Sequence, residues 1–124
     1  MIRALTLAGG GANGEAAACY VARLARSGSY SNPWGLYSGE SIGAVNAYLI
    51  ALLGPSAVAQ EWGWIGQRDI YRGGGLLDRV ATVLGKREGI YDMTPSIGTI
   101  SKLVGNKRLP SNFRVVVTVT DLAT

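Results

Sequence analysis

The hydrophobic positions in the first third of the chain follow the pattern of a strand, a helix and a second strand. Residues 2–8 form a short apolar run that ends in glycines, which is typical of a buried parallel strand. From 15 to 26, apolar residues recur at helical spacing, at Ala17, Tyr20, Val21 and Leu24. Residues 34–37 form a second short strand candidate. This order predicts a βαβ unit with parallel strands and a right-handed crossover.

The pattern further along predicts several helices and one more strand. Residues 42–53 are apolar on nearly every face, which predicts a helix buried in the middle of a domain. Apolar stripes at helical spacing recur over 76–84 and again over 97–104, after a helix start at 93–96. Residues 115–119 are β-branched throughout, which predicts a strand in the interior of a sheet. The elements together predict an α/β fold with a mainly parallel central sheet.

Length and composition favour one folded domain. The chain has 124 residues, of which 48% are hydrophobic and 16% charged, so disorder is excluded as a general description. A strand as apolar as 115–119 normally leads into more sheet, and the sequence stops soon after it. We therefore expect residues 1–124 to form a single but partial domain.

Two residue counts exclude whole classes of site. The sequence contains no histidine and one cysteine. A Ser-His-Asp or Cys-His catalytic set, a histidine metal site, a thiolate zinc site and an internal disulfide are therefore all excluded within this chain. We expect no metal ion.

The charge and the absence of targeting signals narrow the choice of partners. The net charge is +4, but the basic residues are scattered and form no run longer than a pair, which disfavours a nucleic-acid surface. The charge is compatible with a mild attraction to anionic lipid surfaces. No signal peptide is recognisable, and the apolar stretch over 42–54 is too short to span a bilayer. We expect a cytoplasmic or otherwise soluble protein, with peripheral membrane contact compatible with the sequence.

A G-x-S-x-G motif stands between the second strand and the buried helix. It consists of Gly39, Ser41 and Gly43 with Glu40 and Ile42 between them. A sharp strand-to-helix turn exposes a serine hydroxyl, and the flanking glycines allow the backbone to bend. The N-terminus of the helix presents unpaired N–H groups to a developing oxyanion. Ser41 is the candidate nucleophile; the alternative is that Ser41 is an ordinary helix cap.

A glycine-rich segment follows the first strand. Gly9, Gly11 and Gly14 satisfy G-x-G-x-x-G, which also occurs in dinucleotide-binding folds. Such a site needs an acidic residue at the end of the second strand, and the sole candidate, Glu40, lies inside the serine motif. A P-loop is excluded because Glu15 occupies the lysine position. The competing interpretation is an oxyanion hole built from the backbone N–H groups of Gly10 and Gly11.

The two motifs together resemble the patatin-like phospholipase family. The resemblance lies in Leu7-Ala8-Gly9-Gly10-Gly11-Ala12-Asn13-Gly14 and in Gly39-Glu40-Ser41-Ile42-Gly43-Ala44-Val45-Asn46-Ala47. It continues in Gly89-Ile90-Tyr91-Asp92-Met93-Thr94-Pro95 and in the strand from Phe113 to Thr124. The resemblance covers nearly the whole chain in the right order, and it corresponds to the N-terminal portion of a family domain.

Membership of this family implies a three-layer α/β/α fold and a serine lipid acyl hydrolase that needs no histidine, metal or cofactor. By resemblance, Ser41 is the nucleophile and Gly39 and Gly43 shape its turn. The oxyanion hole is implied at Gly9, Gly10, Gly11, Gly14 and Ile42. The family's catalytic aspartate lies in an Asp-Gly-Gly or Asp-Gly-Ala motif, and no aspartate here precedes a glycine. Asp121 matches the end of a core strand, so the base is expected outside this chain.

The expected function is a phospholipase or esterase acting through an acyl-serine intermediate on a lipid or small ester, with contact at a membrane surface compatible with the charge. We expect no nucleic-acid partner, and the fragment by itself is expected to be inactive. One alternative is an inactive truncated protein or a lipid-binding module; another is a nucleotide-binding fragment. Asn13 departs from the family, which usually has a basic residue there.

Five other features have simple structural interpretations. We expect Cys19 to pack against the sheet, and Trp62 and Trp64 to pack in the core. Asp92 is expected to anchor a loop and Asp78 to lie on a solvated helix face. The glycines at 73–75 are typical of a mobile linker.

Overall fold

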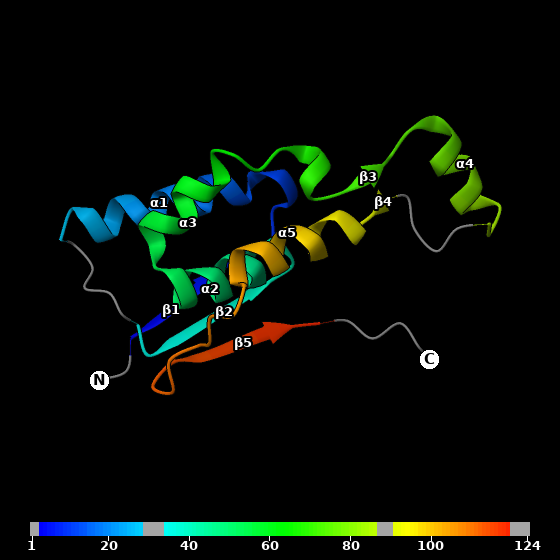
Figure 1. Cartoon of the computed structure of the whole chain (residues 1–124). Helices are drawn as coiled ribbons and strands as arrows, with labels where there is room; N and C mark the ends of the chain where they lie inside the picture. The colour runs from blue at the N-terminus through cyan, green and yellow to red at the C-terminus, as the bar shows by residue number, and fades with distance from the viewer. Residues whose placement is uncertain (1–2, 29–33, 87–90, 120–124) are drawn as a thin grey trace. The chain divides into compact units, whose positions relative to one another are not determined.

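The computed structural model describes residues 3–28, 34–86 and 91–119 (Figure 1). The chain divides into two compact units, residues 1–64 with 106–124, and residues 65–105. The expectation that 1–124 form one partial domain stays a prediction.

A parallel sheet of three strands forms the base of the first unit. The strands are β1 (Ala4–Leu7), β2 (Leu36–Glu40) and β5 (Arg114–Thr118), in the order β1-β2-β5 (Figure 1). Leu7 pairs with Gly39 and Gly39 with Val117, so the carboxyl ends of all three strands meet at one edge. The predicted α/β fold with a parallel sheet is confirmed.

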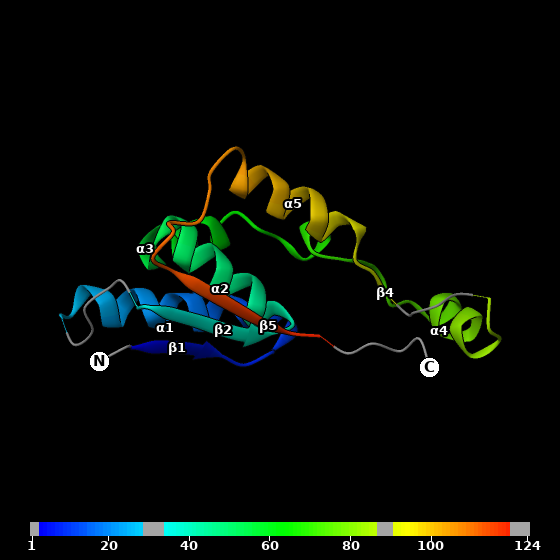
Figure 2. The ribbon, with the colours of Figure 1, turned by 90° about the horizontal axis from the view of Figure 1, so that it is seen from below.

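Three helices flank this sheet. They are α1 (Gly14–Arg26), α2 (Ile42–Leu53) and α3 (Pro55–Trp62), and a 3₁₀ turn, η1 (Gly11–Asn13), precedes α1. Helix α2 packs against all three strands, and α1 packs against α3 and α2 (Figures 1 and 2). The prediction of a buried helix over 42–53 is confirmed, because half of the residues in α2 are buried, namely Gly43, Asn46, Ala47, Leu49, Ile50 and Ala51.

Tyr37 anchors the centre of the core. Its side chain is fully buried, its ring lies edge-on to Trp34 at 6.0 Å and 5.5 Å from Phe113, and its hydroxyl accepts a 3.2 Å hydrogen bond from the Trp34 N–H. Burial raises the pKa of Tyr37, and the Trp34 N–H opposes this by stabilising the ionised form. The core of the first unit therefore contains an aromatic cluster centred on Tyr37 of β2.

The expectation of an interior strand at 115–119 is wrong within the described residues. β5 lies at an edge of the described sheet, and Val116 and Val117 are 55% and 51% exposed. The Thr6 and Ser38 hydroxyls share a 2.8 Å hydrogen bond on the face that also carries Val116. A β-branched sequence indicates a pleated surface, and burial depends on what packs against that surface.

The buried side of α1 also differs from the expectation. The buried residues are Gly14, Ala18, Val21 and Ala22, whereas Tyr20 is 63% exposed and Cys19 is exposed. Small residues face the interior because α1 packs against α3, and small side chains allow the two helices to approach closely. The predicted packing of Cys19 on the sheet is therefore wrong.

The second unit, residues 65–105, contains a two-residue antiparallel pairing and two helices. Strands β3 (Arg72–Gly73) and β4 (Tyr91–Asp92) pair, η2 (Gln67–Asp69) precedes them, and the helices are α4 (Leu76–Val83) and α5 (Thr94–Val104). None of the described residues of this unit is buried. The helices predicted over 76–84 and from 94 are confirmed, but they enclose no core of their own.

Local contacts in this unit bear on three expectations. Gly73 lies in β3, and a Cβ on Gly74 would overlap the Tyr91 ring, so these two glycines lie where β3 pairs with β4 rather than in a linker. Asp78 accepts a 3.1 Å hydrogen bond from the Gly75 N–H and so caps α4. Asp92 anchors a loop as expected, through a 2.9 Å bond from the Thr94 N–H. Among the helices of the described ranges, none has the length and apolar character required to cross a membrane.

Candidate active site

Ser41 occupies a strained turn between β2 and α2. Strand β2 ends at Glu40, α2 begins at Ile42, and Ser41 between them has φ of +51° and ψ of −131°. It is the one non-glycine residue with positive φ in the described parts of the chain. Such a conformation costs about 1–3 kcal/mol in a residue with a side chain, so the surrounding packing must impose it. A strained serine between a strand and a helix is the geometry in which the hydroxyl of a nucleophile is presented.

The two glycines of the motif are required by close packing. A Cβ on Gly39 would lie 2.5 Å from the carbonyl carbon of Gly43, and a Cβ on Gly43 would overlap the carbonyl oxygen of Leu7. Both distances are far below van der Waals contact, so a larger residue at either position displaces backbone. These glycines let the start of α2 lie directly against the ends of β1 and β2.

The Ser41 hydroxyl does not cap the helix. Ser41 precedes α2 in the N-cap position, but its side chain makes no capping hydrogen bond, and its carbonyl oxygen accepts the Ala44 N–H at 3.0 Å. Within the described ranges, no hydrogen bond occupies the hydroxyl, and the residue is exposed. The alternative of an ordinary helix cap predicts a bond from a backbone N–H to this oxygen, which is absent.

The glycine-rich segment lies beside Ser41. A Cβ built on Gly9 would be 3.2 Å from the Cβ of Ser41 and 3.5 Å from the Cγ of Glu40. The structure thus brings the two motifs together from positions about thirty residues apart in the chain. The contact follows from the parallel pairing of β1 and β2, because both motifs begin where their strands end.

Several backbone N–H groups near this turn are free in the described structure. In the described structure, no hydrogen bond engages the N–H of Gly10, Gly11 or Ile42. Gly11 has φ of +54°, which favours glycine, and Ile42 lies at the positive end of the α2 dipole. The Gly14 N–H instead donates to the Gly11 carbonyl oxygen. Of the residues expected at the oxyanion hole, Gly9, Gly10, Gly11 and Ile42 therefore keep a free N–H in the described structure, and Gly14 does not.

Asn46 fixes the glycine segment to the helices. Its Nδ2 donates to the Gly14 carbonyl oxygen at 2.8 Å, and its Oδ1 accepts from Trp62 Nε1 at 2.8 Å. Asn46 is fully buried, and a Cβ on Gly14 would come within 2.6 Å of the Cγ1 of Ile42. This network was not predicted from the sequence. Its signal was an amide side chain in an otherwise apolar helix, since a buried polar group needs partners.

The expectation of core packing is confirmed for one of the two tryptophans and is wrong for the other. Trp62 is buried at 7% exposure, as predicted, and takes part in the Asn46 network. Trp64 is 82% exposed, so the expectation of core packing is wrong for it. Helix α3 ends at Trp62, and the chain leaves the packed helices before Trp64.

The described aspartates are all engaged in local turns. Asp69 accepts a 2.8 Å hydrogen bond from the Gly66 N–H, and Asp78 and Asp92 bind the N–H groups of Gly75 and Thr94. Asp121 lies outside the described residues. Over the ranges that the structure describes, no group of acidic and cysteine side chains could hold a metal ion. Asn13 is exposed, and its N–H donates to Gly10, which supports the turn of η1.

Comparison with family models, with curated proteins and with solved structures gives no match for this chain. Arguments about its function therefore depend on the geometry around Ser41.

Proposed function

We propose that this chain is the N-terminal portion of a patatin-like phospholipase domain, a three-layer α/β/α serine lipid acyl hydrolase. The observation that carries the proposal is the strained backbone of Ser41 beside the glycine-rich segment, with Gly9 in near contact. Strain at a polar residue persists where function requires it. A purely structural turn would place glycine at a φ of +51°, because glycine adopts that conformation without cost.

In the proposed reaction, the Ser41 Oγ attacks the carbonyl carbon of a lipid or other carboxylic ester while its proton passes to a carboxylate base. The carbonyl oxygen becomes an oxyanion, which receives hydrogen bonds from the N–H groups of Gly10, Gly11 and Ile42. The C–O bond to the alcohol then breaks, and the alcohol leaves with the proton from the base. Water hydrolyses the acyl-serine by the same steps and restores the hydroxyl.

The base is an aspartate supplied from outside this chain. No aspartate of the sequence precedes a glycine, and the three described ones already bind backbone N–H groups. The serine–aspartate dyad is what the resemblance to the patatin-like family implies for a chain in which residues 1–124 contain no histidine. An ordinary aspartate has a pKa near 3.9 and is a weak base, so this one needs an apolar surrounding that raises its pKa.

The backbone donors then supply much of the rate acceleration. Loss of one oxyanion donor typically costs about 3–4 kcal/mol of transition-state stabilisation. The positive end of the α2 dipole adds to the stabilisation of the anion. Neither a metal ion nor a cofactor is part of the proposed chemistry.

Active-site labelling tests this function. The protein expressed from its complete coding sequence is treated with a fluorophosphonate, and the modified peptide is identified by mass spectrometry. We expect an adduct on Ser41 that is lost in Ser41→Ala. Ser38→Ala serves as the matched control, because Ser38 lies in β2 three residues before Ser41 and its hydroxyl already bonds to Thr6. Labelling that persists in Ser41→Ala contradicts the assignment, and fatty-acid binding without any labelling favours the lipid-binding module.

A second candidate function, dinucleotide binding, has one observation in its favour. Glu40 is the last residue of β2, adjacent to the glycine-rich segment after β1, which is where such folds place the carboxylate that binds ribose. The test is a thermal shift with NAD. A nucleotide site predicts stabilisation that is lost in Glu40→Gln and kept in Ser41→Ala. The hydrolase predicts no stabilisation by NAD in any variant.

A further inference from the structure

Helix α4 presents a continuous apolar stripe to solvent. At about 100° per residue, its large apolar side chains fall within an arc of about 120° on one side of the helix. All of them are strongly exposed: Leu76 77%, Leu77 86%, Val80 46%, Val83 87% and Leu84 62%. No other described helix or strand packs extensively against α4. Exposed apolar patches of this kind mark interaction surfaces.

The charges around the stripe are positive. Between 76 and 86 the acidic side chain is Asp78, which lies opposite the stripe and caps the helix through the Gly75 N–H. Arg79 lies at the border of the stripe and Lys86 follows the helix, and both are exposed. An apolar stripe bordered by cations is typical of helices that lie in the interface of an anionic membrane.

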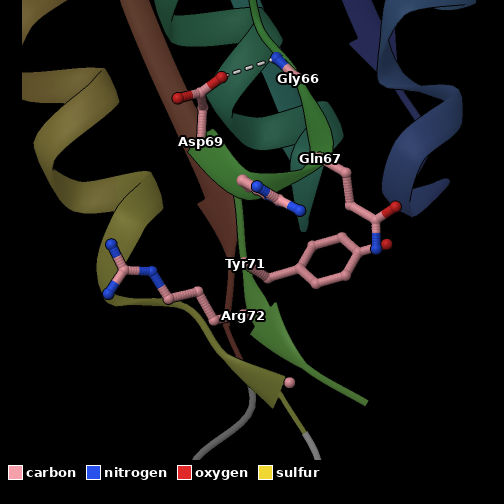
Figure 3. Close-up of a pocket in the computed structure, with 7 residues that line it drawn as sticks. Gly66, Gln67, Asp69, Tyr71 and Arg72 are labelled. Atoms are coloured by element: carbon pink, nitrogen blue, oxygen red, sulfur yellow. Dashed lines mark hydrogen bonds between the residues drawn. The ribbon is translucent and has the colours of Figure 1, made fainter. Parts of the chain in front are cut away.

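A second feature of the same unit is a cavity with cationic side chains in its lining. An open cavity of about 1050 Å³ is lined by residues 66–69 and 71–73, and these include Arg68 and Arg72 (Figure 3). Across the described residues, neither guanidinium has an ion pair or hydrogen bond. The carboxylate of Asp69 is held by the Gly66 N–H at 2.8 Å (Figure 3). An arginine without an ion pair suits a phosphate group, to which its guanidinium donates two hydrogen bonds at once.

We propose that residues 65–105 carry a docking surface for an anionic phospholipid membrane. The apolar stripe of α4 enters the interface, and Arg68 and Arg72 bind lipid phosphates. A membrane fits better than a protein partner, because the stripe lies on one isolated helix with cations at its border, and the cavity nearby in sequence is also cationic. This binding does not depend on the chemistry proposed for Ser41.

Vesicle co-sedimentation of the full chain tests the proposal. Vesicles of phosphatidylcholine with about 30% phosphatidylglycerol are compared with pure phosphatidylcholine. We expect the double variant Leu77→Ser, Val83→Ser to weaken binding to the anionic vesicles by roughly 100-fold, since two apolar side chains no longer enter the interface. Arg68→Gln and Arg72→Gln are each expected to weaken that binding about fivefold and to leave binding to pure phosphatidylcholine unchanged.

Two controls separate the proposal from its alternatives. Tyr20→Ser removes an exposed aromatic side chain (63% exposed) from α1 and is expected to leave vesicle binding unchanged. Ser41→Ala is expected to bind vesicles like the parent protein, so a failure of the hydrolase function leaves this result intact. The proposal is overturned if the stripe variant binds as well as the parent. It is also overturned if the parent does not bind the anionic vesicles, and a dimer that the stripe variant abolishes would then assign the stripe to a second copy of the chain.

Discussion

Ser41 keeps a backbone conformation that a glycine would adopt at lower cost. Its φ of +51° is imposed by the close approach of Gly39 and Gly43 to neighbouring backbone. Stability and the proposed function therefore favour different residues at this position. Such conflicts are expected at catalytic sites, where strain is retained because it positions a reacting group.

Replacing Ser41 with glycine measures this conflict. We expect Ser41→Gly to have a free energy of unfolding about 1 kcal/mol higher than Ser41→Ala, because glycine relieves the strain and alanine does not. Urea denaturation of the two variants gives the difference. Equal stabilities would show that the turn is not strained at this residue.

Adding one methyl group tests the close packing beside Ser41. We expect Gly43→Ala to destabilise the protein by about 3 kcal/mol or more, since the new Cβ overlaps the carbonyl oxygen of Leu7. Gly98→Ala in α5 is the matched control, because a Cβ there has no atom within 4 Å. That change should stabilise the protein by up to about 1 kcal/mol through helix propensity. The midpoints of chemical denaturation of both variants provide the comparison.

At the scale of single residues, the sequence predicted the candidate nucleophile Ser41. It did not predict the hydrogen bonds of Asn46 that hold the neighbouring glycine-rich segment. Ser41 was recognisable because a glycine-flanked serine stood between a strand and a helix. Asn46 was not, since its partners are the Gly14 carbonyl oxygen and the indole of Trp62, which are 32 and 16 residues away. Contacts at that separation depend on how helices pack, and no local pattern encodes them.

At the scale of elements, the Asn46 network joins three helices to the glycine-rich segment. It connects the start of α1, the middle of α2 and the end of α3. The network is fully buried at Asn46, where hydrogen bonds are strong and an unpaired group is costly. We infer that Asn46 acts as a positioning residue for the segment that supplies the Gly10 and Gly11 N–H groups.

A double-mutant cycle measures this link. Asn46→Ala is expected to lower the free energy of unfolding by about 3 kcal/mol, because it leaves the Gly14 carbonyl oxygen and the Trp62 N–H unpaired in the core. Trp62→Phe is expected to cost about 2 kcal/mol by leaving the Asn46 oxygen unpaired. The two costs should add to more than that of the double variant, as coupled groups do. Strict additivity in urea denaturation would argue against a shared network.

Element types were more predictable than element exposure. The strand β1 and the buried α2 followed from hydrophobic runs bounded by glycine, whereas the second strand was predicted at 34–37 and lies at Leu36–Glu40, where it includes Ser38 and Gly39. The exposed residues of α1 and β5 could not be predicted in the same way. A stripe of apolar residues shows that one side of an element can be buried, but it does not show which other element packs against that side. On α1 the side with small residues is buried. On β5 the side chains of Val116 and Val117 are each about half exposed to solvent.

At the scale of the whole molecule, burial is confined to the first unit. Tyr37, Ile50 and Val58 are at most 1% exposed, whereas none of the described residues of 65–105 is buried. Local stability follows the number of buried apolar contacts. The unit that carries the proposed membrane surface is therefore held together mainly by local hydrogen bonds and partly exposed side chains.

Amide hydrogen exchange tests this difference. We expect the amides of α2 to exchange last and those of α4 to exchange first, because opening α4 exposes little additional apolar surface. Anionic vesicles should slow exchange in α4 and leave α2 unchanged. Mass spectrometry of peptic fragments resolves the two helices. Equal protection of α4 and α2 in the absence of vesicles would contradict the picture of one buried core.

The exposure of Cys19 on α1 makes the protein ready for single-site conjugation. It is the one cysteine in the sequence, and its side chain is open to solvent. A maleimide dye or spin label therefore attaches at one defined point without any engineered residue. Helix α1 begins at Gly14, which Asn46 holds, so a probe on Cys19 reports the order of the helix next to the glycine-rich segment. A label on the native thiol therefore allows the region near Ser41 to be followed by fluorescence or electron paramagnetic resonance.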